Sequence, residues 1–321
     1  MGDDNDEKST QSPSFSNLPM EIHSQILKEL DPIHRLIVRK VSRRLRLIVD
    51  NDSPQVNSIK LTGKDDGSCL SIAFDDKTSL DFIPKDGGCQ IDFEKRSMTV
   101  PGVAHHEMAL NFLKPLFLNP KLRLQNLTMW CDFDMNYLID SLTEIVTNSS
   151  NTPFHVKNLA ITLRKPVELT SIIAFFKPGV LETLDIQGCE KYQPKLMDFM
   201  ETPHFKQAKV VTSSRCEPLN SPAMIERFLH LKAFEVRILY VSFEDLRWLR
   251  KIISRSPTVK QCKIYLYFHL TMELIHKAFP GGDLERTSIA CYYDYHIPNS
   301  QEILSFTIRA NLIEVERKLQ E

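Results

Sequence analysis

The sequence predicts an α/β protein in which a short N-terminal group of helices precedes a larger β/α solenoid. Three observations support this fold class: helix start signals within residues 15–52, apolar residues at strand spacing that recur beyond residue 120, and helical patterns between those strands. The chain has 321 residues, of which 42% are hydrophobic and 25% charged, as in ordinary globular domains. We expect four segments: a disordered acidic lead (1–14), a helical module (15–52), a short β-strand segment (53–104) and a repeat domain (105–321).

Charge and composition exclude several classes of function. Lys and Arg total 40 against 41 for Asp and Glu, so the chain has no overall field to attract nucleic acid or an anionic membrane. No apolar run approaches the roughly 20 residues that span a bilayer. The first residues, MGDDNDEKSTQS, are acidic where a secretory signal would be basic and then apolar, which predicts a cytoplasmic or nuclear protein.

Signatures of catalysis and of bound cofactors are missing from the sequence. The seven cysteines never form C-x-x-C and are expected to be reduced, mostly buried thiols. None of the ten glycines builds a phosphate-binding loop, and no G-x-S-x-G is present. His105-His106-Glu107 lacks the second histidine of a zinc site, because Leu110 stands there. We therefore expect no catalytic residue, metal or cofactor, although catalytic groups that meet only through the fold would escape this reading.

Residues 15–52 contain the predicted helices of the module. Pro19 suits a first helical turn and Glu21 suits its positive end, so a helix begins here with Asn17 or Leu18 as its cap. Its apolar residues fall at helical spacing: Ile22, Ile26, Leu27 and Leu30.

A second helix is predicted from Asp31 as N-cap and Pro32 as first residue, with a break near Ser42 and an end near Val49. Its apolar set is Leu36, Ile37, Val41, Leu45, Ile48 and Val49. Helices this short bury little surface alone, so either a partner or the rest of the chain must cover part of it.

Arginines at a spacing of four occupy another face of this helix, at Arg35, Arg39 and Arg43. One interpretation is a helix that contacts nucleic-acid phosphates, together with Arg44 and Arg46. A solvated face is favoured over it, because the chain is neutral and has no base-reading motif.

Short alternating segments follow the module. Strands are predicted at 59–61, 70–74, 80–83 and 91–93, separated by turns rich in Gly and Asp. A helix is expected from Met108 to Leu118, ending at Asn119-Pro120.

A loose L-x-x-L-x-I repeat begins at Leu124, and its steps of about 23 to 32 residues overlap those of leucine-rich repeats. Alternation along the strands places one set of residues inside: Leu127, Leu159, Leu184, Phe234 and Cys262. Ala208/Val211 and Ile289/Cys291 are weaker members. Helix cues between the strands, such as Ser242-x-x-Asp245, complete a leucine-rich-repeat-like β/α solenoid. The chain closes with a hairpin around Ala310-Asn311 or, alternatively, a helix through Leu319.

The outward positions of these strands supply candidate target-binding residues. Trp, Tyr and Arg dominate the energetics of protein interfaces, and the candidates are Trp130, Arg164, Arg237, Tyr265, Tyr267 and Tyr292. Packing of these side chains on neighbouring strands is an equally good explanation.

The string L-P-x-E-I-x-x-x-I-L-x-x-L-D-P at 18–32, followed by R-L-x-V-R-K-V-S-R-R-L-R at 35–46, resembles an F-box. That resemblance implies a non-catalytic motif that docks on the Skp-type adaptor of a cullin-RING ubiquitin ligase. Carried over, the main adaptor-facing candidates are Leu18, Pro19, Ile22, Ile26 and Leu27. Leu36 and Val41 would contribute either to docking or to the packing of the module.

A second resemblance begins with A-L-N-F-L at 109–113 and N-P-K-L-R-L-Q-N-L at 119–127. These residues are similar to the FTH domain that follows the F-box in a large nematode family (F-box A type), and the likeness extends over roughly 56–317. It implies protein–protein interaction and supplies no catalytic residue.

Two functions compete on this basis. The first is a substrate-recognition subunit of an SCF-type ubiquitin ligase, whose partners would be the Skp-type adaptor, through it a cullin, and an unknown target protein. The second is a scaffold that uses its F-box and repeats outside a ligase, to tether a protein or an RNA-binding partner. An enzyme is a third and weaker hypothesis.

Overall fold

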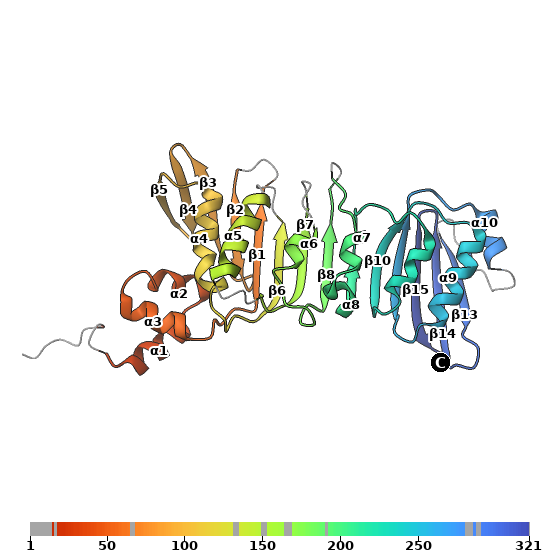
Figure 1. Cartoon of the computed structure of the whole chain (residues 1–321), viewed down its shortest axis with the longest axis horizontal. Coiled ribbons are helices and arrows are strands. Elements are labelled where there is room, and N and C mark those ends of the chain that lie inside the picture. Colours follow the sequence, from red (N-terminus) through yellow and green to blue (C-terminus); the bar gives the residue numbers. More distant parts are fainter. Residues whose placement is uncertain are drawn as a thin grey trace, which may run out of the picture.

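The computed structural model describes residues 15, 18–64, 68–130, 135–148, 153–163, 169–189, 192–279, 285–286 and 290–320. At one end, three short helices form a small module that projects from a long sheet (Figure 1). They are α1 (Met20–Glu29), α2 (Pro32–Val38) and α3 (Arg43–Asn51).

The starts of these helices follow the predicted signals, with one exception. Asp31 caps α2, since its Oδ1 accepts hydrogen bonds from the N–H groups of Ile33 (2.9 Å) and His34 (3.1 Å). The predicted break is confirmed, because the Ser42 hydroxyl caps a separate helix α3. The first helix differs: its N-cap is Pro19 rather than Leu18, without a side-chain cap. The other predicted cap, Asn17, lies outside the described residues.

Fifteen strands of the described chain join into one sheet. In chain order they are β1 (Ser58–Gly63), β2 (Leu70–Phe74), β3 (Thr78–Lys85), β4 (Gly88–Phe93), β5 (Arg96–Pro101), β6 (Leu124–Trp130), β7 (Val156–Thr162), β8 (Thr183–Gln187), β9 (Val210–Thr212), β10 (Ala233–Ile238), β11 (Gln261–Leu266), β12 (Glu285–Arg286), β13 (Cys291–His296), β14 (Glu302–Arg309) and β15 (Leu312–Leu319).

A parallel run forms the middle of this sheet, in the order β1, β6, β7, β8, β9, β10, β11. Antiparallel strands extend it at both ends, with β2 to β5 beyond β1 and β15 to β12 beyond β11. The chain is therefore a mixed α/β protein in which helices precede a large sheet, as the sequence predicts at this level.

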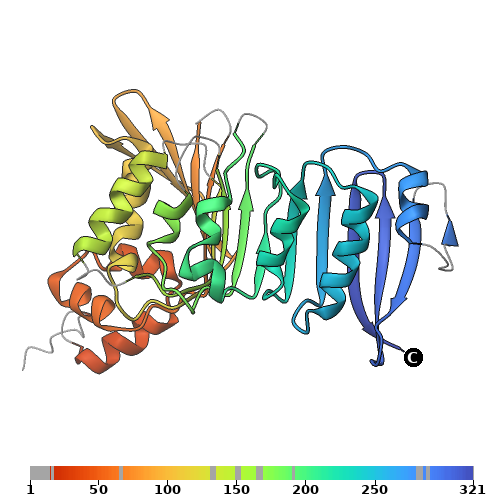
Figure 2. The same cartoon turned by 45° about the vertical axis from the view of Figure 1, so that its right-hand side comes forward.

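Helices between the strands lie along one face of the sheet (Figures 1 and 2). They are α4 (His105–Phe117), α5 (Met135–Asn148), α6 (Leu169–Ile173), α7 (Met197–Met200), α8 (Pro203–Gln207), the 3₁₀ helix η2 (Pro222–Phe228), α9 (Phe243–Arg255) and α10 (Met272–Ala278). The best-capped is α9, where Ser242 and Asp245 form the reciprocal capping box that their spacing predicts.

Buried side chains form continuous rows across the strands beneath these helices. The five residues predicted to point inward are all buried, and their strand register makes them neighbours, with Val211 completing the row between Leu184 and Phe234. Because neighbouring strands lie about 4.8 Å apart, each side chain of the row packs on the next. The alternation in the sequence thus predicts the buried face correctly.

The C-terminal part corrects two expectations. The hairpin is confirmed, since β14 pairs with β15 around Ala310-Asn311, and the alternative helix through Leu319 is wrong. Cys291 belongs to no parallel repeat, because β13 pairs antiparallel with β14. Ile289 lies outside the described residues.

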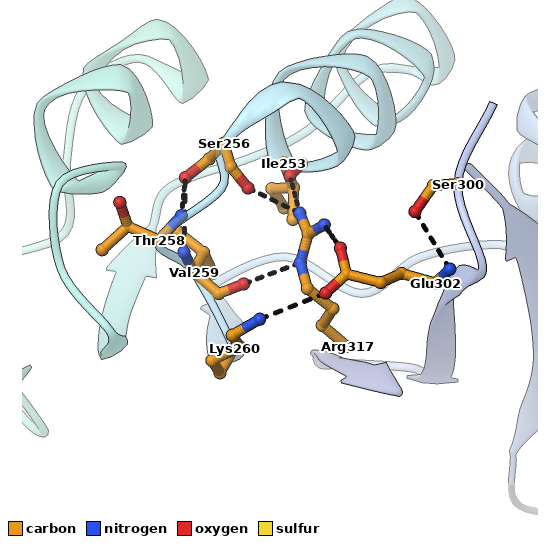
Figure 3. Close-up of polar contacts among 8 residues, drawn as sticks. All are labelled: Ile253, Ser256, Thr258, Val259, Lys260, Ser300, Glu302 and Arg317. Atoms are coloured by element: carbon orange, nitrogen blue, oxygen red, sulfur yellow. Dashed lines mark hydrogen bonds and ion pairs between the residues drawn. The ribbon is translucent and has the colours of Figure 1, made fainter. Parts of the chain in front are cut away.

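A buried arginine fixes this hairpin to the rest of the sheet (Figure 3). The side chain of Arg317 is 4% exposed and pairs with Glu302 at 2.7 Å. It also donates to the carbonyl oxygens of Val259 (3.0 Å), Ile253 (2.8 Å) and Ser256 (2.6 Å). Two of these carbonyls lie at the C-terminal end of α9, where unpaired carbonyls favour a cation.

The helical module is held to the sheet by the loop that follows α4. The Asn119 amide donates to the carbonyls of Asp50 and Asp52 (3.1 Å each), and the Lys121 ammonium donates to that of Asn51 (2.6 Å). Both side chains thus bind the C-terminal end of α3. Leu36 adds an apolar contact, since it belongs to the main core with residues of α4 and the first strands.

Candidate protein-docking surfaces

Exposed apolar side chains gather on the helical module. Of fifteen large apolar residues that are exposed in the described chain, seven fall before residue 52, although the module supplies few of the described residues. They are 39 to 72% exposed: Phe15, Met20, Ile22, Ile26, Ile37, Val41 and Leu47. We call this set the apolar module surface. Such a concentration of exposed apolar groups is typical of a protein-binding site.

The core inside the module is small by comparison. It consists of Leu27, Leu45 and Ile48, with a few half-buried neighbours. Leu27 is 1% exposed, so in this chain it supports the helices rather than offering surface to a partner. The same holds for Leu36, which packs in the main core.

The remaining adaptor-facing candidates are accessible. Ile22 and Ile26 are one turn apart on α1 and both are exposed, and Val41 is 72% exposed. Pro19 is exposed and Leu18 half-buried, and the Leu18 carbonyl accepts a 2.8 Å hydrogen bond from Arg44 of α3.

Sequence reasoning missed four members of the apolar module surface as docking candidates: Phe15, Met20, Ile37 and Leu47. Ile37 and Leu36 are adjacent in one apolar stretch, yet Ile37 is exposed while Leu36 is buried. Periodicity alone cannot separate a face covered by the same chain from one left open. Phe15 is placed by a contact that the sequence does not reveal. Its ring packs edge-on against the buried His23, with 4.7 Å between the ring centroids.

The second candidate surface is the sheet face that carries no connecting helix in the described chain. Its predicted target-binding residues do not converge. Trp130 lies on β6, with the Lys60 ammonium 5.0 Å from its ring, and three strands separate it from β10. Tyr292 lies beyond β15 and β14 on the far side of β11. Arg164 lies outside the described residues.

Arg237 and Tyr265 are brought together, since they are direct neighbours on β10 and β11. Both are half-buried. Burial raises the pKa of the Tyr265 hydroxyl, and the nearby Glu235 raises it further. Around them, polar groups satisfy one another: Glu314 pairs with Lys263 and Arg309, and Asp185 accepts from Thr212 and Gln187. This part of the face offers few unpaired groups to a ligand.

More accessible aromatic groups lie just beyond the carboxyl ends of β10 and β11. Tyr267 and Phe268 are each 59% exposed, with ring centroids 5.4 Å apart, and their N–H groups bond to the carbonyls of Ile238 and Leu239. Tyr240 follows Leu239 and is also exposed. We call Tyr240, Tyr267 and Phe268 the aromatic edge. Only Tyr267 was predicted, because it continues the alternation of Lys263 and Tyr265 along β11, whereas Tyr240 and Phe268 fall out of phase with the outward residues of their strands.

Within the described residues, no three His, Cys, Asp or Glu side chains are grouped so that they could hold a metal ion. Burial raises the pKa of Cys216 and of Cys262 to about 12, which keeps these thiols protonated and unreactive. Within the same residues, none of the helices combines the length and the apolar character needed to cross a bilayer.

Comparison with known proteins agrees with this arrangement. The F-box domain model matches residues 15–56, which include all three helices of the module, and the FTH domain model matches residues 136–280. A curated relative, F-box A protein 224 of Caenorhabditis elegans, is 24% identical over 279 residues, which amount to 81% of this chain and 68% of that protein.

Proposed function

Because the chain belongs to the nematode family that joins an F-box to an FTH domain, we propose that it is the substrate-recognition subunit of an SCF-type cullin-RING ubiquitin ligase. An F-box generally binds a Skp1-type adaptor and is not itself catalytic. The apolar module surface carries the proposal, since it supplies uncovered apolar groups on the domain that such an adaptor binds.

The proposed mechanism is templating. The module holds the adaptor while the sheet domain holds a target, which raises the effective concentration of target lysines near the ubiquitin-loaded enzyme. The bond-making chemistry then belongs to other subunits, in the cytoplasm or nucleus.

For the sheet domain we propose a leucine-rich-repeat-like solenoid that presents the target-binding surface. The buried row supports it: its successive members, Leu127, Leu159, Leu184, Val211, Phe234 and Cys262, are 23 to 32 residues apart and adjacent in register. Trp130, Arg164, Arg237, Tyr265, Tyr267 and Tyr292 remain proposed contact residues, and the aromatic edge adds Tyr240 and Phe268.

The test is co-expression of the full chain with a Skp-type adaptor, followed by size-exclusion chromatography and a binding titration. Ile22→Asp with Ile26→Asp should weaken the complex by about a hundredfold or more, because two apolar contacts are lost and two carboxylates are buried. Both positions are exposed, so the isolated chain should keep its circular dichroism spectrum.

Met98→Asp is the matched control, since Met98 lies outside the module on the edge strand β5 and is 59% exposed, against 39% for Ile22 and for Ile26. It should leave the complex unchanged. Equal binding by the double variant would refute the assignment of this surface. An adaptor complex that never captures a cullin would instead favour the scaffold function.

A further inference from the structure

We propose that the acidic segment 3–7 of this chain docks on an arginine face of α3, made of Arg43 and Arg46, and so competes with an adaptor for the apolar module surface. The docking itself stands on charge and reach within the chain. The competition rests on the proposed function, because it is the adaptor of a recognition subunit that the segment would displace.

Two arginines of α3 pair with no carboxylate in the described part of the chain. Arg43 and Arg46 are exposed and three residues apart, so they lie on one side of the helix. We call this pair the arginine face. The first turn of α3 holds no acidic residue, and cations there oppose the positive end of the helix dipole. An acidic segment beside this face would offset both charges.

The cations that precede the arginine face are already engaged. Arg35 pairs with Asp52 at 2.5 Å and Arg39 with Asp50 at 2.6 Å, while the Lys40 ammonium lies over the ring of an aromatic residue of α4. Asp50 is the one carboxylate of α3. Because Arg39 takes it up, the charge of the arginine face is left for a group from elsewhere.

The sequence before residue 15 supplies the opposite charge. Asp3, Asp4, Asp6 and Glu7 stand within five positions, and Lys8 is the one cation among residues 2–14. Elsewhere in the sequence no five consecutive residues hold more than two carboxylates. The segment is therefore the most acidic stretch of the chain and complements a face that carries only positive charge.

The described chain begins beside the arginine face. Phe15 packs on the buried His23 of α1, whose Nε2 donates to the Phe15 carbonyl oxygen (2.8 Å). Arg44 of α3 donates to the Leu18 carbonyl oxygen, which joins the start of α1 to the first turn of α3 (Figure 1). The nine residues from Phe15 back to Asp6 can span up to about 30 Å, whereas α3 is about 14 Å long. The carboxylates therefore reach either arginine.

A segment docked on this face covers part of the adaptor surface. Leu47 is 60% exposed and lies one turn after Arg43. Exposed ion pairs are individually weak, but the tether gives the segment a high effective concentration at the face. If about two thirds of the molecules are closed, the apparent adaptor affinity falls about threefold, because only the open fraction binds.

The first experiment tests the contact in the full chain without adaptor. Arg43→Lys with Arg46→Lys keeps both charges and adds amines, which a carbodiimide couples to nearby carboxylates as amides. Mass spectrometry of the digested protein identifies the linked residues. We expect links from residues 3–7 to positions 43 and 46 at least fivefold more often than to Lys28. These links should disappear in 1 M salt, where the Debye length is about 3 Å.

Lys28 is the matched control, since it is exposed in the last turn of α1 and lies within reach of the same tether. Lys232, exposed next to β10, reports links between separate molecules. Links to positions 43 and 46 that are no more frequent than links to Lys28 would overturn the docking.

The second experiment measures adaptor affinity by titration. The neutral-segment variant carries four changes and should bind a Skp-type adaptor about threefold more tightly at low ionic strength, with no difference in 1 M salt. The changes are Asp3→Asn, Asp4→Asn, Asp6→Asn and Glu7→Gln. Unchanged affinity in this variant would overturn the competition.

A control variant neutralises four exposed carboxylates outside the module and should bind the adaptor as the parent chain does. They are Asp86, Glu94, Glu226 and Asp294.

Arg43→Gln with Arg46→Gln distinguishes the acidic segment from the adaptor as occupant of the arginine face. Release of the segment should raise adaptor affinity as in the neutral-segment variant. Weaker binding than in the parent chain would show that the adaptor itself uses these arginines, and would overturn the competition. A parent chain that binds no adaptor removes the ligase role and the competition together, while the cross-links still decide the docking.

Discussion

Asp31 connects α1 to α2, and its carboxylate is held by both backbone and side-chain partners. It accepts hydrogen bonds from two backbone N–H groups and pairs with His34. Burial acts to raise the pKa of Asp31, but the hydrogen bonds and charge of His34, with the N–H of Ile33, lower it below the usual value.

A depressed carboxyl pKa has a definite consequence for acid stability. The stabilisation that Asp31 provides is complete above its unfolded pKa of about 3.9 and is lost as the pH falls through the lower folded value. Asp31→Asn keeps an N-cap acceptor but cannot titrate, and should make the helical signal of the module less dependent on pH below 4. Far-UV circular dichroism of both proteins between pH 2 and 7 tests this, and superimposable curves would contradict it.

The Arg317 side chain joins β15 to β14, to Val259 just before β11 and to the end of α9. Arg317→Ala should lower the free energy of unfolding by about 3 kcal/mol, because it leaves buried carbonyls and Glu302 without their partner. Arg317→Lys should recover part of this, since it keeps the charge but loses the planar fork.

Lys318→Ala is the matched control for urea unfolding of these variants, because Lys318 is the next residue and is exposed. A loss in Arg317→Ala no larger than in Lys318→Ala would show that the network contributes nothing to stability.

Elements whose signal is local could be predicted from the sequence. The caps Asp31, Ser42 and Ser242 act within three residues, and the buried rows follow from alternation along single strands. No local pattern in the sequence indicates which distant strands pair. The sheet places β15 beside β11 and β1 beside β6, so that paired residues are 47 to 68 positions apart in the chain, and the partners of Arg317 lie 15 to 64 residues away.

The same reason explains which site residues were found. Ile22 and Ile26 are candidates through the resemblance to an F-box, and spacing places them on one apolar helix face, but burial of Leu27 and Leu36 depends on which helix or strand packs against them.

Asn119 and Lys121 couple the helical module to the sheet domain. Removing both side chains, in Asn119→Ala with Lys121→Ala, deletes three hydrogen bonds at the end of α3 and should cost about 3 kcal/mol of coupling. Amides of α2 and α3 should then exchange with deuterium faster, while those of β7 keep their protection.

Lys232→Ala, an exposed residue remote from this joint, is the control for hydrogen exchange. Unchanged protection of α2 and α3 in the double variant would show that the apolar contact through Leu36 holds the module without these bonds.

The parallel run also sets a scale of length. The module is anchored beside β1 and β6, whereas the aromatic edge lies on β10 and β11, four or more strands along the sheet. Each strand adds about 4.8 Å in the hydrogen-bonding direction. Gain or loss of one strand–helix unit in a related chain would therefore move a bound protein by one strand spacing relative to the adaptor. The residues of the two contact surfaces would not have to change. The distance between the two docking surfaces is therefore set by the number of parallel strands between them.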